Sequence, residues 1–271
     1  MTLSVRCLGS GSSGNALLVE AGATAVVVDC GIGARALASG LRAAGLATTN
    51  VAAVLLTHEH ADHVRALPQV LKAGVPLVAT AGTARAADLP VGRTEIVYAG
   101  RSVAVDAIEV TPLPVSHDAA EPCGFHLRAD GIAVTVVTDL GRGDAALHDH
   151  LAEADLIVLE ANHDEAMLRA GPYPTHLKRR VLSPSGHLSN ADCGALLAAA
   201  LRGAKAPPTI WLAHLSSTNN LPALAQQTVQ RSLASHGLTP AVVPLPRNGH
   251  DRVWQPGRDP GGAVQLAMPL A

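Results

Sequence analysis

This sequence of 271 residues has few aromatic side chains, few charges and few cysteines, and each shortage excludes a class of protein. Aromatic residues make up 2% of the chain, so aliphatic side chains must build the core and few rings are available to stack on bases. The net charge of −2 excludes a global basic field, so any contact with nucleic acid must rest on a local patch. With 48% hydrophobic and 15% charged residues, the chain is of ordinary globular composition.

The four cysteines, Cys7, Cys30, Cys123 and Cys193, lie far apart and form no CxxC pair. We see no signal peptide and no apolar run of bilayer-spanning length, so no membrane contact is expected. Reduced thiols in the cytoplasm are the simplest account, with Cys123 a small buried residue. The length suits one large domain and no linker divides it, so we expect a single domain over 1–271 whose tail, from Gly257, is loosely held.

The most informative stretch is Thr57–His63, T-H-E-H-A-D-H, which directly follows an apolar run that predicts a buried strand. In extended chain the side chains at i and i+2 point the same way, so His58 and His60 can share one cation. Asp62 and His63 fall where the chain turns into the next helix and can hold a second cation nearby. A helix cap needs one short polar side chain and not three imidazoles, so the stretch predicts a metal site.

The rest of the chain alternates between strand and helix patterns. Expected strands cover 4–8, 16–20, 25–29, 51–56, 76–79, 95–98, 102–105, 108–113, 124–128, 132–138, 156–160, 210–213 and 241–243. Expected helices cover 34–44, 64–73, 83–88, 164–170, 176–181, 191–201 and 222–236. Two halves of mixed sheet with helices outside predict an α/β fold, a four-layer αββα sandwich.

The loop Gly9–Asn15, G-S-G-S-S-G-N, formally matches the GxGxxG fingerprint of dinucleotide sites. That site needs a helix directly after the glycines, whereas here a short branched run follows and leaves no room for a crossover. The match is therefore a false positive. Two interpretations stay open: a plain polar turn, or a loop whose Ser12 and Ser13 hydroxyls and backbone N–H groups contact a phosphate.

Further metal donors are expected where other apolar strands end, because such ends converge on one rim of a sheet sandwich. His117, Asp139 and His214 each follow a strand. A lone His or Asp there is more often a loop residue making a local bond, but three at strand ends favour metal binding. We predict two cations about 3.5–4 Å apart, one held by His58, His60 and His117 and the other by Asp62, His63 and His214, with Asp139 as the bridge.

HxHxDH after a strand, then a later His, an Asp at a strand end and a final His, resembles the metallo-β-lactamase superfamily of hydrolases, which has the αββα fold. The resemblance extends to about His236. Within the superfamily, the branch called YycJ/WalJ is similar in the Gly9–Asn15 loop and in Glu160–Asp164, Ser185–Asn190, His214–Ser216 and the pair Asn219 and Asn220. The resemblance implies a divalent-metal phosphodiesterase that acts on DNA as a 5′-to-3′ exonuclease. It also implies that Asp29 braces the ligand loop.

The implied mechanism uses two cations that lower the pKa of a shared water to about 7 and supply hydroxide to attack phosphorus. His187 matches the proton-donating His of ribonuclease-Z-like enzymes, although it can also be an incidental residue of a helix-cap loop. Asp62 and His187 are thus the predicted catalytic residues. Substrate contact or support of the ligands is expected of Asp29, His163, Ser12, Ser13, Asn219 and Asn220; for His163, plain surface exposure is a third option.

The predicted cofactors are two divalent cations, zinc or manganese, because histidines suit zinc while carboxylates and a shared water also allow manganese. The predicted partner is nucleic acid, foremost DNA, as substrate. Lys178–Arg180 is usually a solvated helix face, but beside the site it would supply a phosphate patch. The alternative function is a small-molecule hydrolase acting on a cyclic phosphodiester, thioester or lactone. A non-catalytic binding protein is disfavoured, because no ligand is missing. We expect purely structural roles for His126, His148, His150, His236 and His250.

Overall fold

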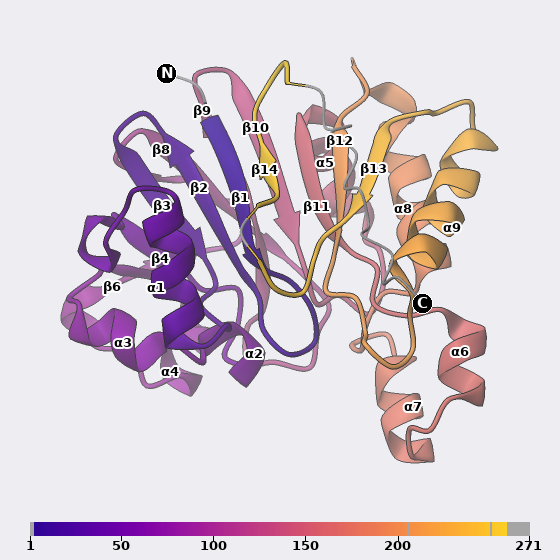
Figure 1. The fold of residues 1–271 in the computed structure, drawn as a ribbon, viewed down its shortest axis with the longest axis horizontal. Helices are drawn as coiled ribbons and strands as arrows, with labels where there is room; N and C mark the ends of the chain where they lie inside the picture. The colour runs from indigo at the N-terminus through magenta and orange to yellow at the C-terminus, as the bar shows by residue number, and fades with distance from the viewer. Residues whose placement is uncertain (1–2, 205, 250, 259–271) are drawn as a thin grey trace, which may run out of the picture.

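Two β-sheets lie face to face in the computed structural model, which describes residues 3–204, 206–249 and 251–258 (Figure 1). The first sheet contains β1 (Leu3–Gly9), β2 (Ala16–Ala21), β3 (Thr24–Val28), β4 (Ala53–Leu55), β5 (Leu77–Thr80), β6 (Thr94–Val97) and β14 (Val253–Trp254). The second contains β7 (Val103–Val105), β8 (Ile108–Pro114), β9 (Cys123–Ala129), β10 (Ile132–Val137), β11 (Leu156–Glu160), β12 (Thr209–Ala213) and β13 (Ala241–Pro244).

Helices lie outside the two sheets, and most of them cover the outer faces (Figure 1). They are α1 (Ala34–Ala43), α2 (Ala61–Val64), α3 (Leu67–Lys72), α4 (Ala81–Ala86), α5 (His148–Glu153), α6 (Glu165–Ala170), α7 (Thr175–Val181), α8 (Asn190–Ala200) and α9 (Pro222–Ala234). Short 3₁₀ turns cover Thr48–Asn50, Val91–Arg93, Ala145–Leu147 and Leu201–Gly203.

Each sheet combines antiparallel and parallel strand pairs. In the order β14-β1-β2-β3-β4-β5-β6, the pairs up to β3 are antiparallel and the later ones parallel. The order β13-β12-β11-β10-β9-β8-β7 starts with parallel pairs and becomes antiparallel from β10 to β7. The mixed sheets expected from the sequence are therefore confirmed. Short turns join β2 to β3, β7 to β8 and β9 to β10, while the parallel strands need longer connections, several of them helical.

Three apolar layers hold the four structural layers together. The central layer lies between the sheets and contains three of the few aromatic residues, Phe125, Trp211 and Trp254. A second layer joins the first sheet to α1, α3 and α4, and a third joins the second sheet to α5, α8 and α9. Because a sheet between two such layers is buried on both faces, strands such as β4 are apolar throughout. The αββα sandwich is confirmed.

The structure differs from expectation near the metal-binding stretch. We expected a helix from Val64, but α2 already begins at Ala61, so Asp62 and His63 lie inside it. The first loop is a turn between antiparallel strands β1 and β2, with Cys7 opposite Leu17, as expected from the missing crossover. Sequence patterns also missed α5, which is a single short helix, and β14, which has only two residues.

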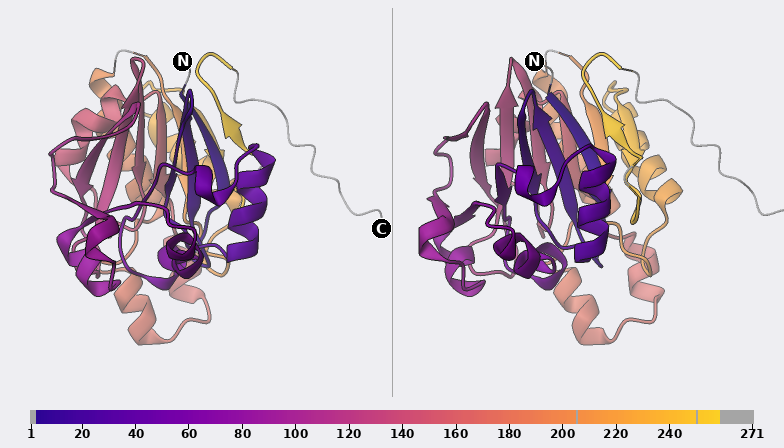
Figure 2. Two further views of the ribbon diagram at one scale, coloured as in Figure 1. Left: turned by 90° about the vertical axis from the view of Figure 1, so that its left-hand side faces the viewer. Right: turned by 60° about the vertical axis from the view of Figure 1, so that its left-hand side comes forward.

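The strands that carry the predicted donors all end at one rim of the sandwich. Strands β3 and β4 run parallel in one sheet; β10, β11 and β12 run parallel in the other, and β8 points the same way, two antiparallel steps from β10. This rim faces downward in Figure 1, and α6 and α7 project beyond it. The two further views in Figure 2 show the same projection below the body of the molecule.

Among the described residues, no helix is long and apolar enough to cross a bilayer. The four cysteines are free and buried. Burial raises the pKa of the Cys7 thiol to about 12, and burial likewise raises the pKa of Cys123, which lies in the central core layer as expected. His250 and the tail beyond Arg258 lie outside the described residues.

Candidate metal centre

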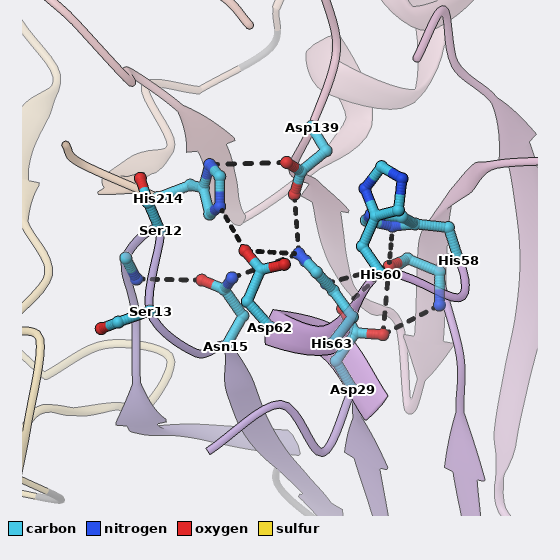
Figure 3. A network of polar contacts seen from close by, with 12 residues as sticks. Ser12, Ser13, Asn15, Asp29, His58, His60, Asp62, His63, Asp139 and His214 are labelled. Atoms are coloured by element: carbon cyan, nitrogen blue, oxygen red, sulfur yellow. Dashed lines mark hydrogen bonds and ion pairs between the residues drawn. The ribbon is translucent and has the colours of Figure 1, made fainter. Parts of the chain in front are cut away.

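The seven predicted donors lie together at the rim of the two sheets, as Figure 3 shows for six of them. Asp139 lies in the middle, with Oδ2 2.9 Å from His63 Nε2 and Oδ1 3.5 Å from His214 Nδ1 and 3.8 Å from His117 Nε2. Both predicted triads, His58, His60 and His117, and Asp62, His63 and His214, are among the groups whose ligand atoms lie within 4.8 Å of one another. Asp139 belongs to two further groups, with His58 and His63 and with Glu160, His187 and His214.

Acceptors behind the rings determine which nitrogen of two histidines faces the cluster. His63 donates Nδ1–H to the carboxylate of Asp29 at 2.7 Å. His214 donates Nδ1–H to Glu160 Oε1 at 2.8 Å. In the neutral form of each ring, which a metal ligand requires, Nε2 carries the lone pair, and His214 Nε2 lies 3.2 Å from Asp62 Oδ2. Carboxylates behind histidines are the usual arrangement at metal sites, where they orient the ring and fix its tautomer.

The other triad is oriented in the same way. His117 donates Nδ1–H to the Gly186 carbonyl at 3.0 Å and turns Nε2 toward His60 Nδ1, 3.2 Å away. Because the Thr57 hydroxyl donates to Asp29 at 2.9 Å, its oxygen accepts from His58 Nδ1–H at 3.0 Å. Burial lowers the pKa of His58 to about 2, so this ring is neutral.

This donor set suits divalent cations, because several of its lone pairs face one another. His58 Nε2 and Asp139 Oδ2 are both buried without a hydrogen-bond partner. When the His63 ring is neutral with its proton on Nδ1, its Nε2 and Asp139 Oδ2, 2.9 Å apart, are two acceptors that face each other, and only a proton or a cation between them relieves this. Burial alone would lower the pKa of His63, but Asp29 and Asp139 outweigh it and raise the pKa well above its usual value. The cluster therefore attracts positive charge at the point where these lone pairs converge.

An unusual backbone places these side chains. Asp29, Asp139 and His214 end or follow buried strands with φ of 58°, 57° and 56°, in the left-handed region that non-glycine residues rarely adopt. This conformation turns the chain sharply at the end of each strand. Such strain is retained where surrounding contacts enforce it, and it concentrates at functional sites.

A buried acid supports the second half of the site. The side chain of Glu160, at the end of β11, is fully buried and accepts from His214, from His187 Nδ1 at 2.9 Å, and from the backbone N–H groups of Leu140 and Leu188. Burial alone would lower the pKa of His187, but the carboxylates of Glu160 and Asp139 raise it. The His187 side chain is 17% exposed, so the ring reaches solvent while one of its nitrogens is held.

Comparison with known proteins supports the interpretation of this cluster as a metal centre. A profile described as the β-lactamase superfamily domain matches residues 24–215. The chain belongs to the metallo-β-lactamase superfamily. The resemblance noted from the sequence is thereby confirmed, since the matched region runs from β3 to just past His214 and includes all seven donors. Members of this superfamily hold divalent metal ions, and the two triads are the candidate ligands here.

Within the superfamily, two similar curated proteins carry the expected names. The chain is 34% identical over 243 residues to exodeoxyribonuclease YycJ of Bacillus anthracis, covering 88% of this chain and 91% of that one. It is 32% identical over 239 residues to exodeoxyribonuclease WalJ of Streptococcus pneumoniae, covering 85% and 88%. The resemblance to the YycJ/WalJ branch is confirmed.

Solved structures of the superfamily share the fold. The metallo-β-lactamase fold protein YhfI from Bacillus subtilis superposes with a TM-score of 0.71 at 17% identity, covering 94% of this chain and all of that one. Zinc-bound PqqB from Methylobacterium extorquens gives 0.63 at 18% identity, covering 89% and 98%. At these identities the likeness concerns the fold alone.

A cavity of about 210 Å³ opens onto the cluster of metal donors described above. Ser12 lines it, as does His187, and Tyr173 and Arg180 reach it from the projecting α6–α7 segment. Ser12 is thus at the open side of the metal-ligand cluster, whereas Ser13 is exposed and lines a different cavity. Of Lys178–Arg180, Arg180 lies at the site, paired with Asp118, while Lys178 donates to the Arg169 carbonyl.

Three residues predicted near the substrate are buried instead. Asn219 and Asn220 lie behind the site, where Asn220 donates to the Ala161 carbonyl and exchanges hydrogen bonds with Asn190. They join loops at the strand ends, so of the two expected roles, substrate contact and support of the ligands, their burial disfavours substrate contact. His163 is 1% exposed and does not line the site cavity, so surface exposure and substrate contact are both wrong for it.

Two residues that support the metal ligands, Glu160 and Asn15, were not predicted from the sequence. The signal for Glu160 was available, because a charged residue that ends a fully apolar strand is buried at the same rim as the predicted donors. Asn15 accepts from the backbone N–H of Gly11, and its Nδ2 lies 3.2 Å from His63 Nε2. Nothing in the loop pattern distinguished Asn15 from an ordinary turn residue.

Proposed function

We propose that this protein is a two-metal phosphodiesterase that hydrolyses nucleic acid, and that DNA digested from its 5′ end is the substrate. The central observation is the pair of histidine- and aspartate-lined triads joined through Asp139 beside an open cavity. The two similar proteins described above are named exodeoxyribonucleases, which supports the choice of DNA. A cytoplasmic location, where DNA lies and thiols stay reduced, suits the four free cysteines.

His58, His60 and His117 would hold one ion and Asp62, His63 and His214 the other, with Asp139 between them. Two bound divalent ions would lower the pKa of a shared water and stabilise the charge that develops on the phosphate oxygens. Five imidazoles favour zinc, and two carboxylates also allow manganese. Metal analysis of the purified protein, followed by reloading with each metal, would decide between them.

His187 is positioned to protonate the leaving oxygen. Its Nδ1 is held by Glu160 at 2.9 Å, and the ring lines the site cavity. Nε2, on the opposite side of the imidazole, is therefore the atom available to the substrate. Removing a general acid typically slows a reaction about 10²–10⁴-fold.

Substrate binding would use the remaining walls of the cavity. Tyr173 is the aromatic residue that lines it, and stacking on one ring contributes about 1–3 kcal/mol per base. Arg180, although paired with Asp118, brings a guanidinium with further N–H donors to the same cavity. This pairing of a ring with a cation suits a nucleotide better than a thioester or lactone.

The test compares two substrates that differ in their leaving group. We expect His187→Ala to keep its bound metal and to lose most of its kcat on 5′-phosphorylated DNA. The loss on bis-p-nitrophenyl phosphate should be much smaller, because p-nitrophenolate is a weak base that leaves without a proton. His176→Ala, an exposed histidine on α7, is the matched control.

Equal losses on both substrates would contradict the proton-donor role. Wild-type protein that hydrolyses the small diester but neither DNA nor RNA would instead favour the small-molecule hydrolase. Cleavage of RNA in preference to DNA would keep the chemistry and change the substrate.

A further inference from the structure

A second cavity, of about 370 Å³, lies on the far side of the first loop from the metal centre. Ser13 and Gly14 of that loop form one wall, and Gly33 and Ala36 at the start of α1 form another. Arg65 and Arg247, from distant parts of the sequence, complete it. Among the residues that the structure describes, none that lines this cavity is acidic.

Both arginines are anchored, with donors to spare. Arg65 Nη1 donates to the Ser13 carbonyl at 2.7 Å, and Arg247 Nη2 donates to the Leu215 carbonyl at 3.2 Å. A guanidinium has five N–H donors, so each keeps several after its backbone bond. In the described ranges of the chain, neither guanidinium forms an ion pair with a carboxylate. Two positive charges that are each held by a backbone carbonyl at one cavity, and that have no carboxylate partner among the described residues, are suited to a phosphate.

The backbone around the cavity adds to this field. Helix α1 has ten residues, and Gly33 caps its N-terminus without any side-chain hydrogen bond. A Cβ at Gly33 would meet nothing within 4 Å, so the space in front of the helix is open. The free N–H groups of a first helical turn carry partial positive charge.

This second cavity lies next to the cavity at the metal centre. Ser12 lines the metal-site cavity, and its neighbour Ser13 lines the cavity of Arg65 and Arg247, which we call the arginine cavity. The tip of one loop therefore separates the two cavities. In Figure 3, Ser12 lies beside His214 while Ser13 points away from the donors. Arg65 directly follows α2, which carries Asp62 and His63, so one rigid segment connects a metal triad with the second cavity.

We propose that the arginine cavity binds a second phosphate of the substrate strand while the metal centre holds the bond to be cleaved. This inference rests on the proposed function and specifies its substrate as a polymer that crosses the Ser12–Ser13 tip. A diester with a single phosphate occupies the metal centre alone and does not reach Arg65 or Arg247.

The experiment uses the metal-loaded full chain with Arg65→Gln, Arg247→Gln and the double variant. On a 5′-phosphorylated oligonucleotide we expect KM to rise about tenfold or more for each variant, because a charged hydrogen bond is lost. The slope of log(kcat/KM) against log[salt] should become shallower by about one for each arginine. Turnover of bis-p-nitrophenyl phosphate should stay within about twofold. Arg42→Gln, an exposed arginine in the last turn of α1, removes the same charge elsewhere and should change neither quantity.

Unchanged KM and salt slope on the oligonucleotide would overturn this inference and leave the proposed function standing. A parallel loss on both substrates would also overturn it, because the arginines would then act by supporting the metal centre. Wild-type protein that cleaves only the small diester would defeat the proposed function itself.

Discussion

Asp29→Asn is expected to weaken metal binding while the fold is kept. Asp29 Oδ1 accepts from the Thr57 N–H at 2.9 Å, and Oδ2 accepts from His63 Nδ1–H at 2.7 Å. An asparagine can keep the first bond through its carbonyl oxygen, but its NH₂ group faces the His63 donor. The His63 proton must then move to Nε2, the atom that faces Asp139. Asparagine tolerates the φ of 58° at this position, so the backbone need not change.

The magnitude follows from the lost support behind one ligand. Removing such a partner typically lowers metal affinity roughly 10–100-fold, which corresponds to about 1.4–2.8 kcal/mol. Competition of the purified protein with a chromophoric chelator would measure the affinity for zinc and for manganese. Thermal unfolding of the metal-free proteins would check that the fold is retained.

Asp106→Asn is the matched control, because Asp106 is exposed and has a φ of 49° in the turn between β7 and β8. It should bind metal as the wild type does. Metal affinity of Asp29→Asn within about threefold of the control would refute the reasoning, since the carboxylate would then not determine the form of His63.

Two further predictions concern the close approach of backbones and a buried histidine. A Cβ at Gly31 would lie 1.6 Å from the Asp62 carbonyl oxygen, so Gly31→Ala should displace α2 and abolish high-affinity metal binding. Gly92→Ala is the control, because a Cβ there meets nothing within 4 Å, and it should bind metal as the wild type does. Metal titration of the two variants would measure the difference. Burial, with a smaller effect of His150, lowers the pKa of His126 from 6.5 to about 4, so the unfolded chain binds its proton first. The free energy of unfolding should therefore fall as the pH drops from about 6.5 to 4, with His126 contributing about 2 kcal/mol of the loss near pH 5. In denaturant unfolding, the stability of His126→Gln should depend less on pH than that of the wild type. An equal pH dependence of the two proteins would contradict this account.

The donor set could be predicted from the sequence because its main signals are local. The spacing in Thr57–His63 determines which side chains share a side of the chain, and it needs no knowledge of distant contacts. His117, Asp139 and His214 were found by one rule, that apolar strands of a sandwich end at a common rim. The structure brings all of them together. Strand positions were predictable for the same reason, since a strand buried on both faces is apolar throughout.

Burial of polar side chains could not be predicted in this way. Asn219, Asn220 and His163 carry the same groups whether they face a substrate or another loop. Only the folded chain shows that Asn220 bonds to Asn190 and the Ala161 carbonyl, and that His163 is enclosed. The early start of α2 has a similar cause, because tertiary contacts override local patterns at element boundaries.

The sequence by itself therefore determined the family, the layered fold and the residues that gather at the metal centre, because these depend on periodicity and short spacings. Tertiary structure decided which groups stand behind the ligands, as Glu160 and Asp29 do, and how closely Gly31 approaches α2. It also decided that Arg65 and Arg247, 182 positions apart in the chain, share a cavity beside the first loop. Those relations arise from the packing of distant segments, which no local pattern of side chains encodes.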